Sequence, residues 1–227
     1  MAVRIITDST SDILPQEAAQ RNLSVIPLKV LFGSECYRDG IDLTHEEFYA
    51  KLERAKTLPT TSQPTPSDFL PLFEEAQRAG DSVVCLLLAG TLSGTVQSAL
   101  IAKEMAGSPD LFVVDSGSTI LGLRLLVDLA LRLREEGASA GEIAEEVERA
   151  KKRIALYAMV DTLEYLHRGG RLSKSVTVVG GLLKMKPVIT LEEGALTVLA
   201  KARGFEGSVD AIFRLMDKTP PAPGAPL

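Results

Sequence analysis

A continuous apolar run at Ser82–Leu88, bounded by Gly80-Asp81 and Gly90, constrains the fold more than any other feature of the sequence. A strand that is apolar at consecutive rather than alternate positions is typically covered by helices on both faces. Further strands are predicted at Val3–Ile6, Ser24–Val30 and Leu111–Val114. Strands that alternate with helices predict a parallel sheet with right-handed crossovers. The N-terminal part is therefore expected to be an α/β domain in which helices flank a parallel sheet.

Helices are expected between and after these strands. The mixed segment Gly33–Leu58 contains one amphipathic helix, His45–Ala55. Pro59–Pro66 is expected to be a loop, and Ser67 can cap the helix that follows it. One further helix is expected to begin at about Pro15, and another to span about Ser93–Met105. A long helix is expected after Asp115–Thr119 and up to about Glu136, followed by one at Ala140–Lys152.

Gly137-Ala138-Ser139 breaks the pattern, so we expect a first domain at residues 1–150 and a second at residues 151–227. The second is expected to be an α/β domain with a mixed sheet. Its elements are predicted as a strand at Ala155–Val160, helices at Thr162–Arg168, Lys174–Lys184 and Ser208–Lys218, and a hairpin of Pro187–Leu191 with Leu196–Ala200. The proline-rich end, residues 219–227, can neither continue a helix nor join a packed sheet, and is expected to be a disordered tail.

The charge of the chain is unevenly distributed. The whole protein carries a net charge of −5, which argues against a main role in binding nucleic acid or another polyanion. Residues 151–205 nevertheless hold ten Lys and Arg against four Asp and Glu, a local excess of +6. Such a stretch indicates either one cationic face for an anionic ligand or partner, or simply charged side chains in contact with water.

The cysteines, the N-terminus and the apolar segments indicate a cytoplasmic protein. Cys36 and Cys85 are far apart and make no disulfide framework. The N-terminus has no signal-peptide pattern, and the longest apolar stretch, Ile120–Leu133, is interrupted by charged residues. We expect no integral membrane segment, while transient contact with a membrane stays open. The few histidines and cysteines have no metal-ligand spacing, so no metal is expected.

Three predicted strands end in small, hydroxyl-rich turns: Thr7–Ser11, Gly90–Thr95 and Asp115–Thr119. In a parallel sheet these turns share the carboxyl edge, where open α/β folds bind ligands. Helices that begin there direct free N–H groups and a positive dipole end at the same place, which favours an anion. Ser, Thr and Gly are also ordinary capping and turn residues, so the turns alone leave both interpretations open.

The turns lack the residues that nucleotide sites need. The chain has no G-x-x-x-x-G-K-[ST] motif and no G-x-G-x-x-G after the first strand. Hydroxyl and N–H groups without Arg or Lys suit a weakly charged group such as a carboxylate better than a phosphate. The helices around the turns are rich in Leu, Ile and Val, so a carboxylate with a hydrocarbon tail, a fatty acid, fits the pattern.

Taken together, the motifs of the chain resemble those of the DegV family and run in order from residue 3 to about residue 215. They are Thr7-Asp8-Ser9-Thr10-Ser11-Asp12, Thr61-Ser62-Gln63-Pro64, Leu92-Ser93-Gly94-Thr95 with Ser98-Ala99, Val114-Asp115-Ser116, Tyr165-Leu166-His167-Arg168-Gly169-Gly170-Arg171, Lys186-Pro187 and Lys201-Ala202-Arg203-Gly204.

The resemblance implies a fatty-acid-binding protein with no cofactor and no catalysis of its own. It would hold an acid such as palmitate or oleate in an apolar tunnel between two domains, while a separate ATP-dependent fatty acid kinase subunit phosphorylates the carboxylate. Thr61 and Ser93 would hold the carboxylate through their hydroxyls. The residues implied to help or to complete the polar end are Ser62, Gly94, Thr95, Ser9, Ser116 and Gly117. Arg171 and Arg203 would lie on the face that meets the kinase subunit.

The chain departs from the family at its C-terminus. Family members continue for several tens of residues with a His-containing motif, and the second domain is therefore expected to be shortened.

Two other functions stay open. Ser93 follows a strand and precedes a helix, as in a stand-alone serine hydrolase or acyltransferase, although its local string is not G-x-S-x-G and neither His45 nor His167 marks a triad. The other is a lipid-free regulatory module that binds a small acid.

Overall fold

The computed structural model describes residues 2–172, 185–192 and 194–220. These belong to two compact units, Met1–Ile154 and Ala155–Leu227. The helix expected at Lys174–Lys184 and most of the expected tail, residues 221–227, lie outside the described residues.

A parallel sheet forms the centre of the first unit, as the sequence predicts. Its strands are β1 (Val3–Asp8), β2 (Leu23–Ile26), β6 (Ser82–Leu87) and β7 (Leu111–Asp115). They lie in the order β2-β1-β6-β7, and every neighbouring pair is parallel. All six residues of β6 are buried, which confirms that the apolar run is a central strand.

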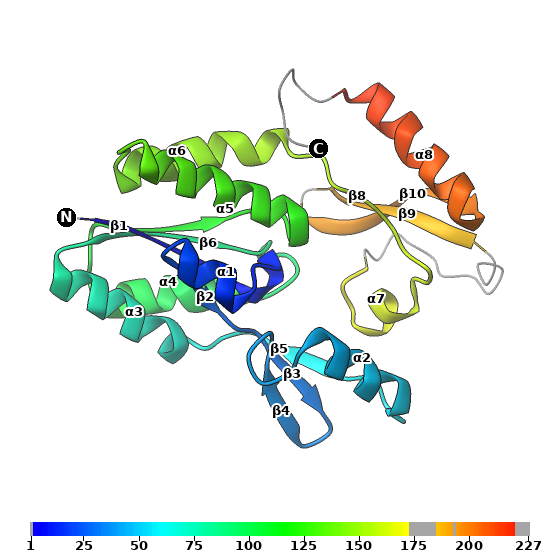
Figure 1. The fold of residues 1–227 in the computed structure, drawn as a ribbon, viewed down its shortest axis with the longest axis horizontal. Coiled ribbons are helices and arrows are strands. Elements are labelled where there is room, and N and C mark those ends of the chain that lie inside the picture. Colours follow the sequence, from blue (N-terminus) through cyan, green and yellow to red (C-terminus); the bar gives the residue numbers. More distant parts are fainter. Residues whose placement is uncertain (1, 173–184, 193, 221–227) are drawn as a thin grey trace. The chain divides into compact units, whose positions relative to one another are not determined.

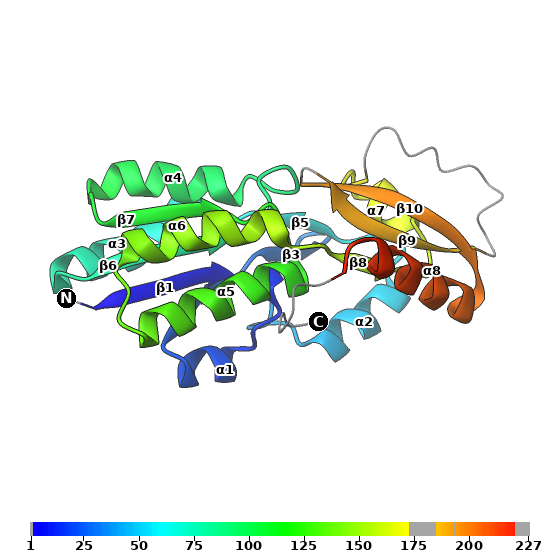
Figure 2. The ribbon, with the colours of Figure 1, turned by 90° about the horizontal axis from the view of Figure 1, so that it is seen from above.

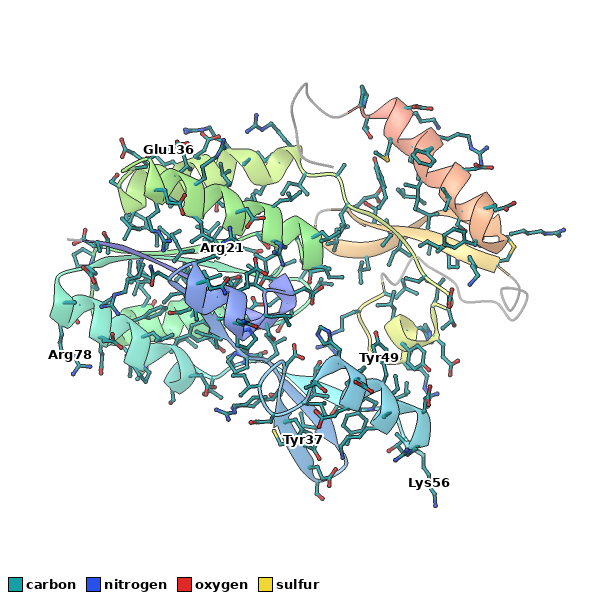
Figure 3. All side chains as sticks on the ribbon, viewed as in Figure 1. Arg21, Tyr37, Tyr49, Lys56, Arg78 and Glu136 are labelled. Atoms are coloured by element: carbon teal, nitrogen blue, oxygen red, sulfur yellow. The ribbon has the colours of Figure 1, made fainter. Side chains whose placement is uncertain are left out.

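Helices cover both faces of this sheet (Figures 1 and 2). One face carries α1 (Pro15–Gln20), α5 (Ile120–Glu135) and α6 (Ala140–Ala150), which a short 3₁₀ turn, Lys151–Arg153, extends. The other face carries α3 (Pro66–Ala79) and α4 (Thr95–Ala106). Side chains alternate along a strand, so Ile5 packs under the first group and Ile6 under the second. On the first face Arg21 of α1 pairs with Asp128 of α5 at 2.6 Å (Figure 3).

The start of α3 differs from the prediction. Thr65 rather than Ser67 is the N-cap, because Pro66 occupies the first helical position, where its missing N–H costs nothing. The Asp68 carboxylate accepts a hydrogen bond from the N–H of Thr65 at 2.7 Å. Ser139 caps α6, and its hydroxyl accepts from the N–H of Glu142 at 3.3 Å.

The predicted strand Ser24–Val30 is wrong as one element, because the chain changes sheets within it. β2 ends at Ile26, and Pro27 has no N–H with which to continue the ladder. The next strand, β3 (Lys29–Phe32), belongs to a second, antiparallel sheet with β4 (Glu35–Arg38) and β5 (Thr60–Ser62), in the order β4-β3-β5.

Both outer strands of this small sheet were missed by the sequence analysis. β5 lies inside the stretch expected to be a loop, and neither β4 nor β5 has the alternating apolar pattern of a strand. The helix α2 (His45–Arg54) lies between β4 and β5 in the chain and begins at the Thr44 cap. Edge-to-face contacts of Phe32 with Tyr37 and Phe48, and of Phe48 with Tyr49, form an aromatic cluster, with the labelled tyrosines on β4 and α2 in Figure 3.

The second unit contains an antiparallel sheet in the order β10-β9-β8. Its elements are β8 (Tyr157–Met159), α7 (Glu164–Arg168), β9 (Met185–Glu192), β10 (Ala195–Arg203) and α8 (Gly204–Lys218). A single parallel bridge joins Leu172 to Leu196. α8 begins earlier than predicted, at Gly204, and the buried Ser208 lies inside it. The Ser208 hydroxyl donates to Lys186 O at 2.7 Å and to Gly204 O at 3.1 Å.

Two further properties of the described residues concern membranes and metals. None of their helices combines the length and the apolar character needed to cross a membrane. In the same part of the chain, no three His, Cys, Asp or Glu side chains gather as a metal site would require.

Candidate functional site

The three hydroxyl-rich turns lie together at the carboxyl edge of the parallel sheet. They follow β1, β6 and β7, and backbone hydrogen bonds join the last two. Ala89 N donates to Ser118 O at 2.8 Å, and Ser116 N donates to Leu87 O at 3.0 Å. The β1 turn is joined to β6 through a buried carboxylate, that of Asp8.

Asp8 is fully buried at the end of β1. One carboxylate oxygen accepts from Leu88 N at 2.8 Å, and the other accepts from the N–H and hydroxyl of Thr10 at 2.9 and 2.6 Å. Burial raises the pKa of Asp8 above its ordinary value, and these hydrogen bonds only partly oppose the increase. Asp8 therefore ties the 3₁₀ turn Ser9–Ser11 to the tip of β6.

Asp115 has a similar role at the tip of β7. Its carboxylate accepts from Gly90 N at 3.2 and 3.1 Å, and from Gly117 N at 2.9 Å. Ser116 is buried, and its hydroxyl donates to Ser118 O and accepts from Ser118 N, both at 3.1 Å. The predicted site groups of Ser116 and Gly117 thus make bonds inside their own loop.

The N-terminus of α4 presents the strongest anion-binding geometry of the site. Gly94 is its N-cap and supplies no side-chain capping bond. The N–H groups of the first turn have no partner within the helix, and the dipole gives this end a partial positive charge. The Ser93 hydroxyl lies 2.9 Å from the hydroxyl of buried Thr95, so two hydroxyls accompany the free N–H groups.

Gln63 brings the end of β5 to this helix terminus. Its side-chain amide donates to Gly94 O at 3.3 Å and to Ser98 Oγ at 3.2 Å. Thr61 lies two residues before this contact and Ser93 one residue before Gly94, so the contact places their two chain segments next to each other. The structure thus joins the two segments that contain Thr61 and Ser93 through Gln63 and Gly94.

Thr61 and Ser62 face opposite sides of β5, because side chains alternate along a strand. Thr61 pairs with the buried Val30 of β3, whereas Ser62 pairs with Lys29. The Ser62 hydroxyl lies 3.4 Å from Gln63 O. Thr61 therefore faces the same side of the small sheet as Val30, and one ligand group is not expected to meet both Thr61 and Ser62 from that side.

Ser9 of the first turn has a structural partner. Its hydroxyl oxygen accepts from Leu28 N at 3.1 Å, in the segment that connects the parallel sheet to the small sheet. This bond holds the base of the small sheet near the carboxyl edge, and so Ser9 shapes the site through the backbone of Leu28.

Thr7 offers a direct test of how this edge is packed. It is fully buried, and among the described residues its hydroxyl has no hydrogen-bond partner. Thr7→Val keeps the side-chain shape and removes the unpaired hydroxyl, so we expect it to raise the free energy of unfolding by roughly 1 kcal/mol. Chemical denaturation of both proteins measures this change, and a lower stability of the valine variant would show that the hydroxyl is paired.

The loop after β7 leads to apolar side chains at the start of α5. Ile120 adopts φ 50°, a left-handed conformation that is unfavourable for a β-branched residue. Ile120 and Leu121 are 46% and 60% exposed, unlike the buried residues deeper in the helix. Apolar surface therefore adjoins the polar loops of this edge.

The two predicted partner-facing arginines belong to the second unit and are both exposed. The Arg171 side chain donates to Gly169 O at 2.7 Å, and Arg203 is the last residue of β10. The residue after Arg171 bridges to Leu196, near the start of β10. Seven residues of strand rise, roughly 20 Å, separate Leu196 from Arg203, so the two arginines mark opposite ends of β10.

Ser93 has no triad geometry in the described part of the chain. Its hydroxyl lies 2.9 Å from the hydroxyl of Thr95, and within the first unit His45 makes no hydrogen bond to it. His45 lies in the first turn of α2, where its charge lowers the pKa of Asp12 against the larger effect of burial. A serine nucleophile needs an adjacent base, and the described residues show none bonded to Ser93.

Sequence reasoning missed the contacts that Asp8 and Gln63 make at this edge. Both stand inside quoted motifs, but neither was assigned to the site. A signal existed for Asp8, since a carboxylate directly after a buried strand commonly accepts N–H groups from the next loop. No local signal exists for Gln63, because its partners are 31 and 35 residues away.

Comparison with known proteins gives a consistent result. A family model described as an uncharacterised protein of the DegV family matches residues 2–225. A DegV domain-containing protein of Caldanaerobacter subterraneus is 39% identical over 217 residues, which cover 96% of this chain and 77% of that protein. Protein DegV of Bacillus subtilis is 35% identical over 219 residues, which cover 96% and 78% of the two chains.

Solved structures agree with the sequence matches. A fatty-acid-binding DegV family protein from Thermus thermophilus superposes with a TM-score of 0.88 at 36% identity, covering 96% of this chain and 78% of that one. The crystal structure of DegV from Bacillus subtilis, described as a fatty acid binding protein, superposes with a TM-score of 0.84 at 35% identity and the same coverage.

Proposed function

This chain belongs to the DegV family, and from that membership and the geometry of its carboxyl edge we propose that it binds a long-chain fatty acid. The protein holds the acid and performs no chemistry on it. The solved relatives described as fatty acid binding proteins support this assignment, because they share the fold over almost the whole chain.

One observation supports the position of the carboxylate more than any other. The Gln63 contact sets the end of β5 against the uncapped N-terminus of α4. In the proposal, the Thr61 and Ser93 hydroxyls and the N–H groups of Gly94 and Thr95 hold the carboxylate. Uncharged donors at a helix N-terminus suit a single negative charge in this way.

The remaining predicted residues support the site less directly. Ser62 has a secondary role, because its side chain faces the other side of β5. Ser9, Ser116 and Gly117 shape the polar end through the loop bonds described above. Ile120 and Leu121 offer apolar surface for the hydrocarbon.

Lipid extraction and mass spectrometry of the purified protein test the proposal. We expect long-chain acids such as palmitate or oleate to co-purify, and the delipidated protein to take them up again. A protein that carries no lipid and has no measurable affinity for either acid would overturn the fatty-acid assignment and favour a lipid-free module for small acids.

The finer part of the proposal is presentation of the bound acid to an ATP-dependent fatty acid kinase subunit in the cytoplasm. Arg171 and Arg203 are exposed cations of the second unit, in a stretch with an excess of positive charge. Exposed cations of this kind steer association with an anionic partner surface.

Arg203→Ala is expected to leave the affinity for palmitate unchanged but to lower the rate at which a family kinase subunit phosphorylates the bound acid, by roughly five- to tenfold. Arg214→Ala is a matched control, because Arg214 is another exposed arginine of the same unit. Loss of palmitate binding in the Arg203 variant would show that this arginine belongs to the lipid site.

A further inference from the structure

Gln63 is exposed, yet it makes two long-range contacts with its side-chain amide. The amide N–H₂ group reaches both Gly94 O at 3.3 Å and the hydroxyl of Ser98 at 3.2 Å. Ser98 is 4% exposed, in the first turn of α4. The side chain thus bonds the helix at its N-cap and again one turn later.

The backbone around Gln63 restricts how this side chain can move. Pro64 follows directly and is buried. Steric contact with a proline ring limits the preceding residue to extended conformations. Gln63 therefore leaves β5 in a fixed direction, towards α4.

The Gln63 amide packs against Gly94 in the space that a side chain would fill. A Cβ added at Gly94 would lie 2.3 Å from Oε1 and 2.6 Å from Nε2 of Gln63, far inside contact distance. The Gly94 backbone, at φ −74° and ψ 13°, is one that any residue adopts. A side chain at this position would therefore displace the Gln63 amide, while the backbone itself would accept it.

From these contacts we infer that Gln63 is a positioning residue, which sets Thr61 against the N-terminus of α4 so that both meet one carboxylate. This inference rests on the proposed function. Gln63 need not touch the ligand, because it acts through β5 on one side and through Gly94 and Ser98 on the other.

The inference predicts that two different substitutions have one effect. Gln63→Ala removes the amide, and Gly94→Ala pushes the end of the same flexible side chain aside. Each should weaken binding of palmitate by roughly three- to tenfold, the range expected for one or two neutral hydrogen bonds. The double variant should bind palmitate with about the same affinity as whichever single variant binds it less tightly, since both changes break the same contact.

Hexadecanol separates a positioning role from a general structural one. It has the palmitate tail without a carboxylate, so its affinity should stay the same in all three variants. Gln97→Ala and Gly141→Ala are matched controls. Gln97 is an exposed glutamine on α4, and a Cβ at Gly141 meets only ordinary contact at 3.7 Å from Phe112.

Each possible result either supports the inference or overturns it. Wild-type affinity for palmitate in Gln63→Ala, equal losses for palmitate and hexadecanol, or additive losses in the double variant would each overturn it. If the unsubstituted protein binds no palmitate, the proposed function fails on its own. Hydrogen exchange then still tests the contact, because both variants should speed exchange of the Ser98 amide, which donates to Gly94 O at 3.0 Å, in the absence of ligand.

Discussion

Replacing Asp8 by alanine is expected to lower the free energy of unfolding by about 2–4 kcal/mol. The carboxylate is fully buried and accepts hydrogen bonds from Leu88 N and Thr10 N. Alanine leaves both N–H groups without an acceptor, at roughly 1–3 kcal/mol each. Relief of the carboxylate's own burial cost keeps the loss below the sum of the two.

Denaturant titration measures this loss, and Asp115→Ala is its matched control. Asp115 also bonds two loop N–H groups at a strand tip, but these groups are exposed, and water can replace the carboxylate. The control should lose no more than roughly 1 kcal/mol. Equal losses in the two variants would show that the buried carboxylate has no special part in holding the edge together.

The pH dependence of stability gives a second test of Asp8. Burial raises the pKa of Asp8 in the folded protein above the unfolded value of about 3.9, so the folded protein holds this proton to higher pH. The contribution of Asp8 to stability therefore falls as the pH rises from the unfolded pKa through the folded pKa, and then stays constant. Asp8→Asn cannot titrate, so the stability difference, wild type minus variant, should fall across the same window. A difference that rises with pH would mean that hydrogen bonds lower the pKa instead.

The other large effect is expected on ligand affinity. Ser93→Ala and Thr61→Ala should each weaken palmitate binding by roughly 1–3 kcal/mol, about 5- to 150-fold in the dissociation constant. Each change removes a hydroxyl that the proposal places on a desolvated carboxylate. The Ser93 variant also leaves the Thr95 hydroxyl without its 2.9 Å neighbour.

Isothermal titration of the delipidated variants measures these losses, and Thr60→Ala is the matched control for Thr61. Thr60 lies next to Thr61 on β5 and pairs with Leu31, so its side chain faces the other side of the strand. It should bind palmitate as the unsubstituted protein does. A loss in the Thr60 variant equal to that in the Thr61 variant would place the carboxylate elsewhere.

Some parts of the site were predictable because they depend on residues that are close in sequence. A strand end, a hydroxyl turn and a helix start follow one another within a few residues at Leu87–Thr95, so their shared edge follows from strand periodicity and parallel pairing. The family motifs added Thr61, which the apolar periodicity does not indicate, since β5 is short and its three residues are all exposed.

Other parts were not predictable, because short segments carry little pattern. β4 and β5 have no apolar alternation and exist because β3 lies between them to pair with both. The change of sheets at Pro27 is also hidden in the sequence, because the apolar residues on both sides of the proline form one run although they belong to different sheets.

The sequence by itself determined the parallel sheet, the helices on its faces and the three hydroxyl turns at one edge, because each depends on local periodicity and on the preference of small polar residues for turns. Only the tertiary structure decided which groups are free to meet a ligand. Ser116 and Gly117 bond within their loop, Asp8 is buried under the edge, and Gln63 joins β5 to α4. These outcomes depend on contacts between residues far apart in the chain, whose geometry exists only after the sheets and helices have packed.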